Sequence, residues 1–421
     1  MSTLRLLHGI RSDGRALSLD EHLHRHGPLP GRQSARELLE LVEASGLRGR
    51  GGGRFPAAAK LRAVAARRGH KIVVANGAEG EPPSGKDKVL LRYAPQLVLD
   101  GVAVAAAAVG ATEAIVAVSE GAPAERASVE AALKERRRAG TDAGLRIRVV
   151  PVPDGFVVGE ESALVNVLGG GPALPTTKPP RPFERGVGGA PTLVQNLETL
   201  AHLALLARRG AAWFREVGTQ EDPGTVLVTL SGAVARPGVY EIALGTPLRE
   251  LVDEAGGPTA PPRAVLVGGY FGSWLDARTA LASRLDAESV AYAGAGLGAG
   301  AVAIVPEGGC ALAEVARVGR WFAGESAGQC GPCVHGLAAI AGTLEALARG
   351  ESSDGDLRLR RWVEQVRGRG ACGHPDGAAS FVGSALDVFS DEVALHLHGR
   401  SCGGRDLGIL PLPRLSARRA A

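Results

Sequence analysis

The chain has 421 residues, of which 45% are hydrophobic and 22% charged, and its formal net charge is +4. This length predicts about three domains, and so small a net charge argues against nucleic acid as a partner. The longest apolar run, residues 97–118, is interrupted by Asp100, Gly110 and Glu113. It predicts a buried helix followed by a strand, not a membrane span.

The first part of the chain predicts an α/β domain over residues 41–218, preceded by an extension over residues 1–40. Helices and short apolar strands alternate along it, as in sheets covered by helices. The expected elements are a helix, glycine-rich loop and helix over 34–66, strands over 71–75, 114–118 and 145–152, a helix over 122–139, and a helix beginning near Gln195.

The texture changes near Gln220, and residues 219–305 predict a small α+β domain. Its expected elements are strands over 225–231, 238–242 and 264–267 and a helix over 247–254. Residues 306–400 predict a helical bundle, with breaks at 324–332, 350–356 and 368–377. Residues 401–421 form a tail, whose basic end Arg414–Arg419 is expected to be solvated.

The glycine-rich loop, Gly46-Leu-Arg-Gly-Arg-Gly-Gly-Gly-Arg-Phe-Pro56, is the most informative stretch. Glycines let a backbone turn tightly and approach a ligand, and exposed N–H groups before a helix attract anions. Lys60 adds positive charge, and Phe55 offers an aromatic face. The loop predicts a phosphate-bearing ligand with a flat ring, although a flexible basic loop is an equal alternative because neither standard nucleotide-binding template is present.

Acidic and amide side chains lie where further loops should meet this one. Glu79 and Glu81 follow the strand at 71–75, and Glu160 and Glu161 precede an apolar helix. Acidic residues at helix starts are usually only dipole partners, but carboxylates beside a phosphate cradle also bind polyol hydroxyls. The amides of Asn76, Gln195 and Asn196 suit the polar edge of a flavin or nicotinamide.

Four of the five cysteines fall after residue 325, as Cys330-Gly-Pro-Cys333, Cys372 and Cys402. A Cys-x-x-Cys pair suits zinc, an iron–sulfur cluster or a redox dithiol, and the further cysteines favour a metal centre. The odd count, without a secretory signal, predicts reduced thiols and a cytoplasmic location. Cys310, in a Gly-Gly-Cys turn, is expected to be a small buried residue.

Together these stretches resemble the family of NADH-binding flavoproteins of respiratory complex I, shared with diaphorase subunits of NAD-linked hydrogenases and formate dehydrogenases. The resemblance covers roughly residues 40–400 and rests on blocks in the family's order. The blocks are Gly46–Lys60, Asn76–Lys88, Gly159–Leu164, Pro191–Thr199, and Glu325–Gly336 with Cys372–Ala379. The chain resembles a divergent member, as the departures below show.

The resemblance implies an FMN- and NADH-binding domain, a ubiquitin-like (β-grasp) soluble-ligand-binding domain and a bundle holding a [4Fe–4S] cluster. Hydride would pass from NADH to FMN, and single electrons would pass through the cluster to a small [2Fe–2S] ferredoxin-like partner. The chemistry is borne by the flavin, with Glu81 and Glu161 assigned to the catalytic site. The implied FMN residues are Gly49, Arg50, Gly51, Gly52, Lys60, Asn76, Glu79, Gly159, Glu160, Asn196 and Thr199; Phe55, Glu81, Glu161 and Lys178 would face the dinucleotide.

The cluster loop departs from the family's pattern of Glu-Ser-Cys-x-x-Cys-x-Pro-Cys. Here it reads Glu-Ser-Ala-Gly-Gln-Cys-Gly-Pro-Cys, so Ala327 replaces one cysteine. The resemblance therefore implies a retained but altered cluster on Cys330, Cys333 and Cys372. Its fourth iron would be open, or would recruit one of four other side chains, namely Ser326, His335, His374 or Cys402.

The nucleotide site departs as well. Ala78 and Gly85 replace an aspartate and a phenylalanine of the family, while Ala63 and Arg181 replace two aromatics. Arg181 would stack on adenine or meet a 2′-phosphate, which leaves NADPH as an alternative coenzyme. Two other interpretations stay open: a non-catalytic assembly module of the same fold, and a zinc-binding structural protein. Any membrane contact would be made through a larger complex.

Overall fold

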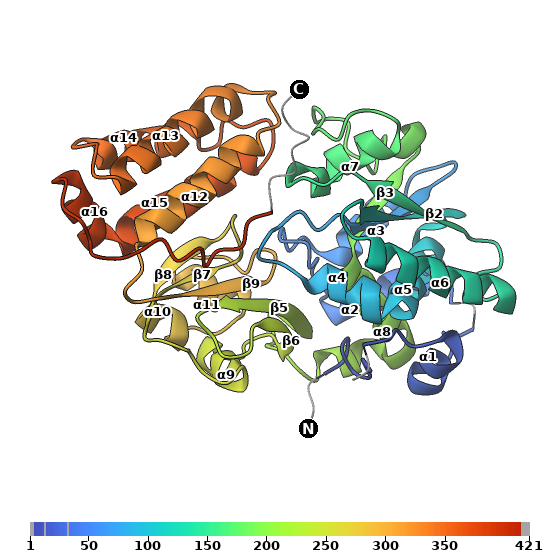
Figure 1. Ribbon diagram of the computed structural model, residues 1–421. Helices are drawn as coiled ribbons and strands as arrows, with labels where there is room; N and C mark the ends of the chain where they lie inside the picture. The colour runs from blue at the N-terminus through green and yellow to red at the C-terminus, as the bar shows by residue number, and fades with distance from the viewer. Residues whose placement is uncertain (1–3, 12–13, 32, 414–421) are drawn as a thin grey trace.

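The computed structural model describes residues 4–11, 14–31 and 33–413. Figure 1 shows an α/β part on the right, a second sheet at the lower left, and helices α12–α16 above that sheet. The predicted solvated end, Arg414–Arg419, lies outside the described residues.

The first sheet is parallel, with the strand order β3-β2-β1-β4. Its strands are β1 (Ile72–Gly77), β2 (Glu113–Ser119), β3 (Arg146–Val152) and β4 (Thr192–Asn196). The first three confirm the predicted strands. Strand β4 is not predicted from the sequence, because its five residues hold only two aliphatic side chains and run directly into a helix. It matters for the site because it places Asn196 directly beside Asn76.

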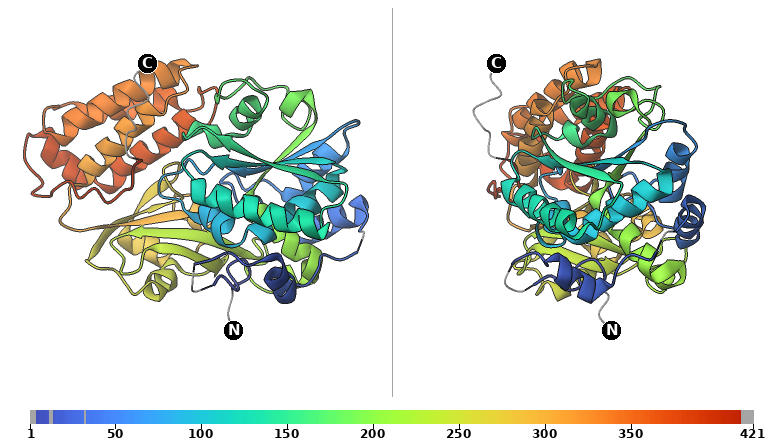
Figure 2. Two further views of the ribbon diagram at one scale, coloured as in Figure 1. Left: turned by 45° about the vertical axis from the view of Figure 1, so that its right-hand side comes forward. Right: turned by 90° about the vertical axis from the view of Figure 1, so that its right-hand side faces the viewer.

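Helices cover both faces of this sheet, as the turned views in Figure 2 show. Helices α5 and α8 pack so closely that a Cβ at Gly101 would lie 1.9 Å from the Leu200 carbonyl oxygen. The helices of this part are α1 (Leu19–His26), α2 (Ala35–Ser45), α3 (Ala57–Ala65), α4 (Lys86–Tyr93), α5 (Pro95–Val109), α6 (Pro123–Ala139), α7 (Glu161–Leu168) and α8 (Leu197–Arg215), with 3₁₀ turns η1 (Val157–Gly159) and η2 (Val187–Gly189).

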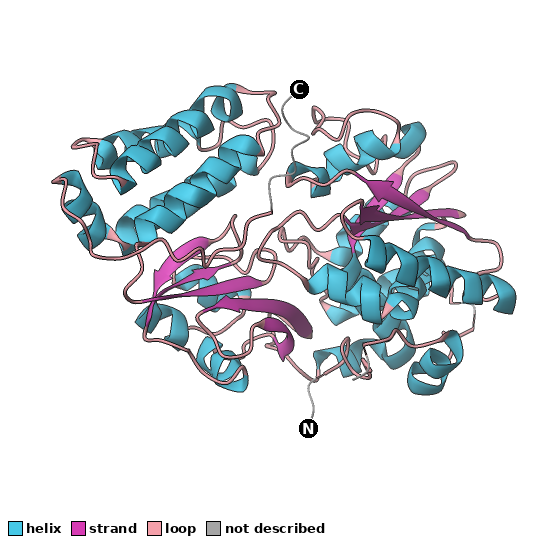
Figure 3. Ribbon diagram, in the orientation of Figure 1, coloured by secondary structure: helices cyan, strands magenta, loops and turns pink. Residues whose placement is uncertain are grey.

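The second sheet is mixed, with the order β6-β5-β9-β7-β8, and only β5 and β9 pair in parallel. Figure 3 shows these strands in magenta, apart from the first sheet. Its elements are β5 (Thr225–Gly232), β6 (Gly238–Ala243), α9 (Leu248–Glu254), β7 (Pro262–Val267), β8 (Ser273–Asp276), α10 (Ala277–Ala282), α11 (Ala287–Tyr292) and β9 (Ala301–Pro306).

The last part of the described chain is helical, and its breaks fall where the sequence predicted them. The elements are α12 (Ala311–Gly324), the π-helical turn η3 (Pro332–Gly336), α13 (Leu337–Ala348), α14 (Gly355–Val366), α15 (His374–Val388) and α16 (Ser390–Leu397). These helices share a hydrophobic core with the second sheet, in which Trp274 and Val305 meet Phe322 and Phe381. The tail then runs back along this part and buries Leu410.

The N-terminal segment is docked onto the rest of the molecule. Backbone N–H groups of Arg5, Leu6 and Leu7 donate to the buried Glu241 carboxylate on β6, at distances of 2.8 to 2.9 Å. Helix α1 contributes His22, whose Nε2 lies 2.7 Å from an Asp100 carboxylate oxygen. Among the described residues, no single helix is long and apolar enough to cross a membrane; α4 and α5 pass that test only as a pair bent by 99°.

Candidate functional site

The predicted ligand residues converge at the carboxyl ends of β1 and β4. Asn76 and Asn196 are partners in the parallel register at this edge. The Asn76 amide donates to the Gly159 carbonyl oxygen at 2.9 Å, which joins β1 to the turn before α7. Asn196 caps α8, since its side-chain oxygen accepts the Glu198 N–H at 3.0 Å. Helix N-termini at the carboxyl edge of a parallel sheet form a site for anionic ligands.

The glycine-rich loop forms a tight hairpin between α2 and α3. The Gly49 N–H donates to the Phe55 carbonyl oxygen at 2.9 Å. Gly51 lies against the β4 edge, where an added Cβ would come within 3.2 Å of the Asn196 Cβ. Gly52 has a φ of 100°, which strongly favours glycine. Phe55 is 59% exposed and leaves an aromatic face open beside the loop.

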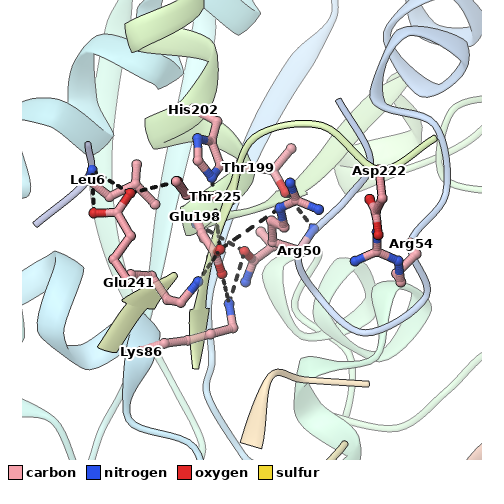
Figure 4. A network of polar contacts seen from close by, with 12 residues as sticks. Leu6, Arg50, Arg54, Lys86, Glu198, Thr199, His202, Asp222, Thr225 and Glu241 are labelled. Atoms are coloured by element: carbon pink, nitrogen blue, oxygen red, sulfur yellow. Dashed lines mark hydrogen bonds and ion pairs between the residues drawn. The ribbon is translucent and has the colours of Figure 1, made fainter. Parts of the chain in front are cut away.

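The Arg50 side chain points toward Glu198 (Figure 4). Its backbone N–H donates to the Thr199 hydroxyl at 2.9 Å, and its side chain is buried, with Nε 4.0 Å from a Glu198 carboxylate oxygen. Burial lowers the pKa of Arg50 to about 10. The guanidinium therefore belongs to an interior network.

That network holds three buried charged residues that the sequence did not single out. Lys86 Nζ lies 2.9 Å from Glu198, 3.2 Å from Asp87 and 3.3 Å from the Asn196 side-chain oxygen. The Asn196 amide donates to Asp87 at 2.7 Å, which fixes the orientation of that amide. Burial raises the pKa of Asp87 to about 7, against the opposing effect of Lys86. The signal available in the sequence was only their place within the blocks that carry the resemblance.

The acidic residues divide between helix caps and ion pairs. Glu79 accepts the Asp87 and Lys88 N–H groups at 3.1 Å each, at the start of α4. Glu160 accepts the Ser162 and Ala163 N–H groups at 2.8 and 3.0 Å, at the start of α7. Helix-start carboxylates stabilise the dipole, as the simpler interpretation expected.

Two lysines bring positive charge to the same acids. Lys60 pairs with Glu161, and Lys178 pairs with Glu160. Burial tends to raise the pKa of Glu160, but Lys178 and other hydrogen-bond donors outweigh it, so the pKa of Glu160 is lowered. Both lysines are part-exposed, so they remain accessible to an anionic ligand.

Glu81 connects the first part of the molecule to the second sheet. One of its carboxylate oxygens accepts the Tyr270 N–H at 2.7 Å, and an added Cβ at Gly269 would lie 2.9 Å from this carboxyl group. Burial raises the pKa of Glu81 to about 8, with a smaller contribution from Glu79. This side chain therefore faces a loop of another part of the chain.

The residues present fit a flavin mononucleotide. Gln195 Nε2 on β4 is buried and has no hydrogen-bond partner among the described residues, so a donor at the strand edge is unused. Gly51, the paired lysines and the amides of Asn76 and Asn196 supply the close backbone approach, positive charge and polar edge that FMN requires.

The three cysteines predicted to bind a cluster come together after α12 and before α15. The Ser326 side chain and the Ala327 N–H lie close enough to the Cys333 thiol to lower its pKa, and the Cys330 thiol raises it. Burial raises the pKa of Cys333 to about 11, and burial also raises the pKa of Cys372, which Cys330 raises further. Three thiols from two segments suit an iron–sulfur cluster with one irregular ligand.

The cysteine site lies against the flavin-side loops. The Phe156 N–H donates to a Glu325 carboxylate oxygen at 2.7 Å, across the two parts of the molecule. Glu160 and Lys178 are close enough to act electrostatically on Cys372. The two predicted cofactor sites are therefore neighbours.

The four alternatives for the missing ligand separate clearly. Ser326 contacts Cys333, His335 is exposed, and His374 is buried with Nε2 2.9 Å from the Phe322 carbonyl oxygen. Cys402 was wrongly included, because it lies beside Cys310 at the opposite end of α12. A helix of 14 residues is about 21 Å long, so Cys402 cannot reach the cluster loop.

The positions at which this chain departs from the family pattern are spread around the predicted nucleotide site. Ala78 is buried, and the Gly85 N–H donates to the Thr229 hydroxyl at 3.0 Å, which ties the loop to β5. The Arg181 backbone N–H donates to Glu184 at 2.9 Å, and this arginine is exposed. Its guanidinium is therefore accessible from solvent.

Comparisons with known proteins agree with this geometry. Three family models match: a Nuo51 FMN-binding domain over residues 42–205, an SLBB domain over 227–269, and the NADH-ubiquinone oxidoreductase-F iron–sulfur binding region over 313–396. An NADH-quinone oxidoreductase subunit of Rhizobium meliloti is 34% identical, covering 88% of this chain and 91% of that protein. The corresponding NADH-quinone oxidoreductase subunit of Mycobacterium tuberculosis is 35% identical, covering 87% and 86%.

Solved structures of an NAD⁺-reducing [NiFe]-hydrogenase give the same result. The H₂-reduced form superposes with a TM-score of 0.79 at 34% identity, covering 86% of this chain and 63% of the hydrogenase chain. The air-oxidised form superposes with a TM-score of 0.83 at 31% identity, covering 98% of this chain and 72% of the hydrogenase chain. The matches confirm the resemblance and the predicted FMN and [4Fe–4S] cofactor classes.

Proposed function

The chain belongs to the family of NADH-binding FMN and iron–sulfur subunits shared by complex I and NAD⁺-reducing hydrogenases, and we propose that it works as the diaphorase subunit of a multi-subunit oxidoreductase. Bound FMN supplies a hydride acceptor that releases electrons singly, and a cluster supplies a one-electron acceptor. The observation that carries the proposal is the adjacency of the two sites, supported by the hydrogen bond of 2.7 Å from the Phe156 N–H, before α7, to Glu325 at the start of the cluster loop.

Each group in the cradle has a physical task. Lys60 supplies charge for the phosphate of FMN, while Asn76 and Asn196 hold its polar edge. Gly49, Gly51, Gly52 and Gly159 give room for close backbone approach, and Thr199 and Arg50 brace the loop from behind. Phe55, Glu81, Glu161 and Lys178 border the space for the dinucleotide. These groups position reactants, and no acid–base residue is required.

The finer architecture extends the family assignment. The second sheet places its two parallel strands centrally in the order β6-β5-β9-β7-β8, with α9 between β6 and β7. This order supports a ubiquitin-like β-grasp domain over residues 219–305. Packing among α12, α13, α14 and α15 supports a helical bundle over 306–400.

The cluster is proposed to use Cys330, Cys333 and Cys372, with Ser326 taking the place of the missing cysteine. Support comes from the contact of the Ser326 side chain with Cys333. Electrons would leave to a small [2Fe–2S] ferredoxin-like partner in the cytoplasm, and any membrane contact would be made through the larger complex. NADH is the proposed coenzyme; the exposed Arg181 makes NADPH the alternative, tested by comparing turnover of both coenzymes in wild type and Arg181→Ala.

The visible spectrum of the anaerobically reconstituted protein, before and after NADH, tests the proposal. We expect flavin bands that bleach on addition, with a broad shoulder from the cluster. A colourless protein that takes up neither FMN nor iron would overturn it and leave the non-catalytic module of the same fold.

A further inference from the structure

We propose that Cys310, Glu392, His396 and Cys402 form a structural zinc site, separate from the cluster. One ligand-type atom from each of these residues lies within 4.8 Å of the others. Cys310, Glu392 and His396 are buried, and Cys402 is half-buried. None of the four belongs to the proposed flavin or cluster sites.

The fold assembles this group from two distant parts of the chain, the start of α12 and the stretch formed by α16 and the tail that follows it. Cys310 caps the N-terminus of α12, and its Sγ lies 3.1 Å from Glu392 Oε1 and 3.8 Å from His396 Nε2. Glu392 and His396 are four residues apart on α16, so they project from one face of that helix. Cys402 arrives from the tail after α16 and contacts the Cys310 thiol.

The donor set matches zinc by its chemistry. Two thiols, an imidazole and a carboxylate are all zinc ligands, and four protein ligands make a closed tetrahedral site. Zinc–ligand bonds of about 2.0 to 2.3 Å place tetrahedral ligand atoms about 3.3 to 3.8 Å apart. The separations here reach 4.8 Å at most, so small side-chain movements close the site. Thiols disfavour calcium and magnesium, which take oxygen ligands.

Neighbouring groups already orient two of the ligands. The Leu312 N–H donates to Glu392 Oε1 at 3.0 Å, and the Ala313 N–H donates to Cys310 Sγ at 3.4 Å. Arg263 holds the other Glu392 oxygen, with Nη1 3.1 Å from Oε2. Fixed outer partners of this kind are typical of metal sites.

The site explains how the tail is held. The Cys310 N–H donates to the carbonyl oxygen of Arg405, three residues after Cys402, at 2.8 Å. Further along, Leu410 is fully buried and the Tyr270 hydroxyl donates to the Pro411 carbonyl oxygen at 2.5 Å. A metal bound at Cys402 would therefore fasten the start of this segment to α12 and α16.

Zinc analysis of the full chain, purified anaerobically from zinc-supplemented medium, tests the proposal. We expect about one zinc per chain, with an X-ray absorption spectrum showing two sulfur and two nitrogen or oxygen neighbours. Cys402→Ser should lower bound zinc at least about tenfold while iron and FMN stay unchanged. Cys330→Ser should lower bound iron and leave zinc unchanged. Ser401→Ala, next to Cys402 in the chain, is the matched control and should change neither zinc nor iron.

Three results would overturn the site. The first is no zinc in the wild-type protein after incubation with zinc, and the second is a disulfide between Cys310 and Cys402 in mass spectra of the anaerobic protein. The third is an X-ray absorption spectrum with three sulfur neighbours around zinc, together with loss of zinc in Cys330→Ser. That result would place the zinc in the cluster loop. If Cys402→Ser fails to fold, Glu392→Gln serves instead, with faster zinc release to a chelator expected. Iron and flavin contents report separately on the proposed diaphorase function.

Discussion

The two ends of α12 carry two groups of metal-ligand side chains that arise in different ways. At its C-terminal end, Cys330 and Cys333 stand three residues apart in one short segment, and this spacing, together with the later cysteines, predicted a metal centre. At its N-terminal end, Cys310 meets ligands from α16 and the tail, more than 80 residues away along the chain. A local motif can be read from the sequence, whereas a group built by tertiary packing becomes visible only in the fold.

Removing a cluster ligand should have the largest effect on metal content and should distinguish the groups at the two ends of α12. Cys372→Ser deletes one of three thiolates, so we expect iron per chain to fall at least about tenfold. Flavin content should persist because the cradle is built on other elements. Iron and FMN assays measure this, and equal iron in wild type and variant would show that Cys372 is not a ligand.

Restoring the fourth cysteine should have the next largest effect. Ala327→Cys supplies a thiol in the loop that already holds Cys330 and Cys333, so iron should rise toward about four per chain, as in a four-cysteine [4Fe–4S] site. Low-temperature electron paramagnetic resonance of the reduced protein checks the cluster type. An unchanged iron count and spectrum would mean that the loop does not direct this position toward the cluster.

Ser326→Ala should have a smaller effect in the same direction as Cys372→Ser. It removes the hydroxyl that contacts Cys333, so we expect a few-fold loss of iron, consistent with the loss of a hydrogen-bonding neighbour of a metal ligand. In the Ala327→Cys background the same change should have little effect, because the added thiolate takes over. Ser401→Ala is the matched control at the other end of α12. Equal iron loss in both backgrounds would exclude Ser326 as the substitute ligand.

The smallest predicted effect on the two groups of metal-ligand side chains concerns Glu81, another contact that the fold supplies. Its folded pKa is raised to about 8 from 4.5, so the folded protein keeps a proton that the unfolded chain releases between these pH values. Stability should therefore fall as pH rises through this range. Glu81→Gln still accepts the Tyr270 N–H but cannot ionise.

Denaturant unfolding at several pH values measures this effect. Relative to wild type, the unfolding free energy of Glu81→Gln should rise by about 3 to 4 kcal/mol between about pH 5 and about pH 8. Glu250→Gln, on the exposed face of α9, is the control. Parallel pH profiles for Glu81→Gln and wild type would show that Glu81 titrates normally.

Much of the α/β part could be predicted because its strands are continuous apolar runs between helices. Strand β4 could not, since five residues with Gln195 and Asn196 at the end carry little strand signal; pairing with β1 decides its conformation. The bundle breaks followed glycine and proline clusters. Cys310 was correctly expected to be buried, but nothing local pointed to Glu392 and His396.

Within the cradle, the sequence identified residue types better than their orientations. Asn76 and Asn196 lie at the strand edge, Gly51 lies against Asn196, and the contacts of Lys60 with Glu161 and Lys178 with Glu160 link predicted residues. The inward turn of Arg50 and the buried Lys86, Asp87 and Glu198 depend on which face of each element is covered. That information belongs to tertiary packing.

The docking of the first residues onto Glu241 affects whether the second sheet can be separated from the rest of the chain. Burial raises the pKa of this carboxyl group, and the N–H groups of Arg5, Leu6 and Leu7 oppose the rise. The second sheet therefore borrows hydrogen-bond donors from a segment more than 200 residues earlier. Excised as residues 219–305, it would leave the Thr225 hydroxyl as the remaining donor to the Glu241 carboxylate and would lose the three N–H donors of the N-terminal segment. Residues 219–305 of this chain are therefore not equivalent to an independent domain. Grafting them into another protein would have to include the N-terminal segment.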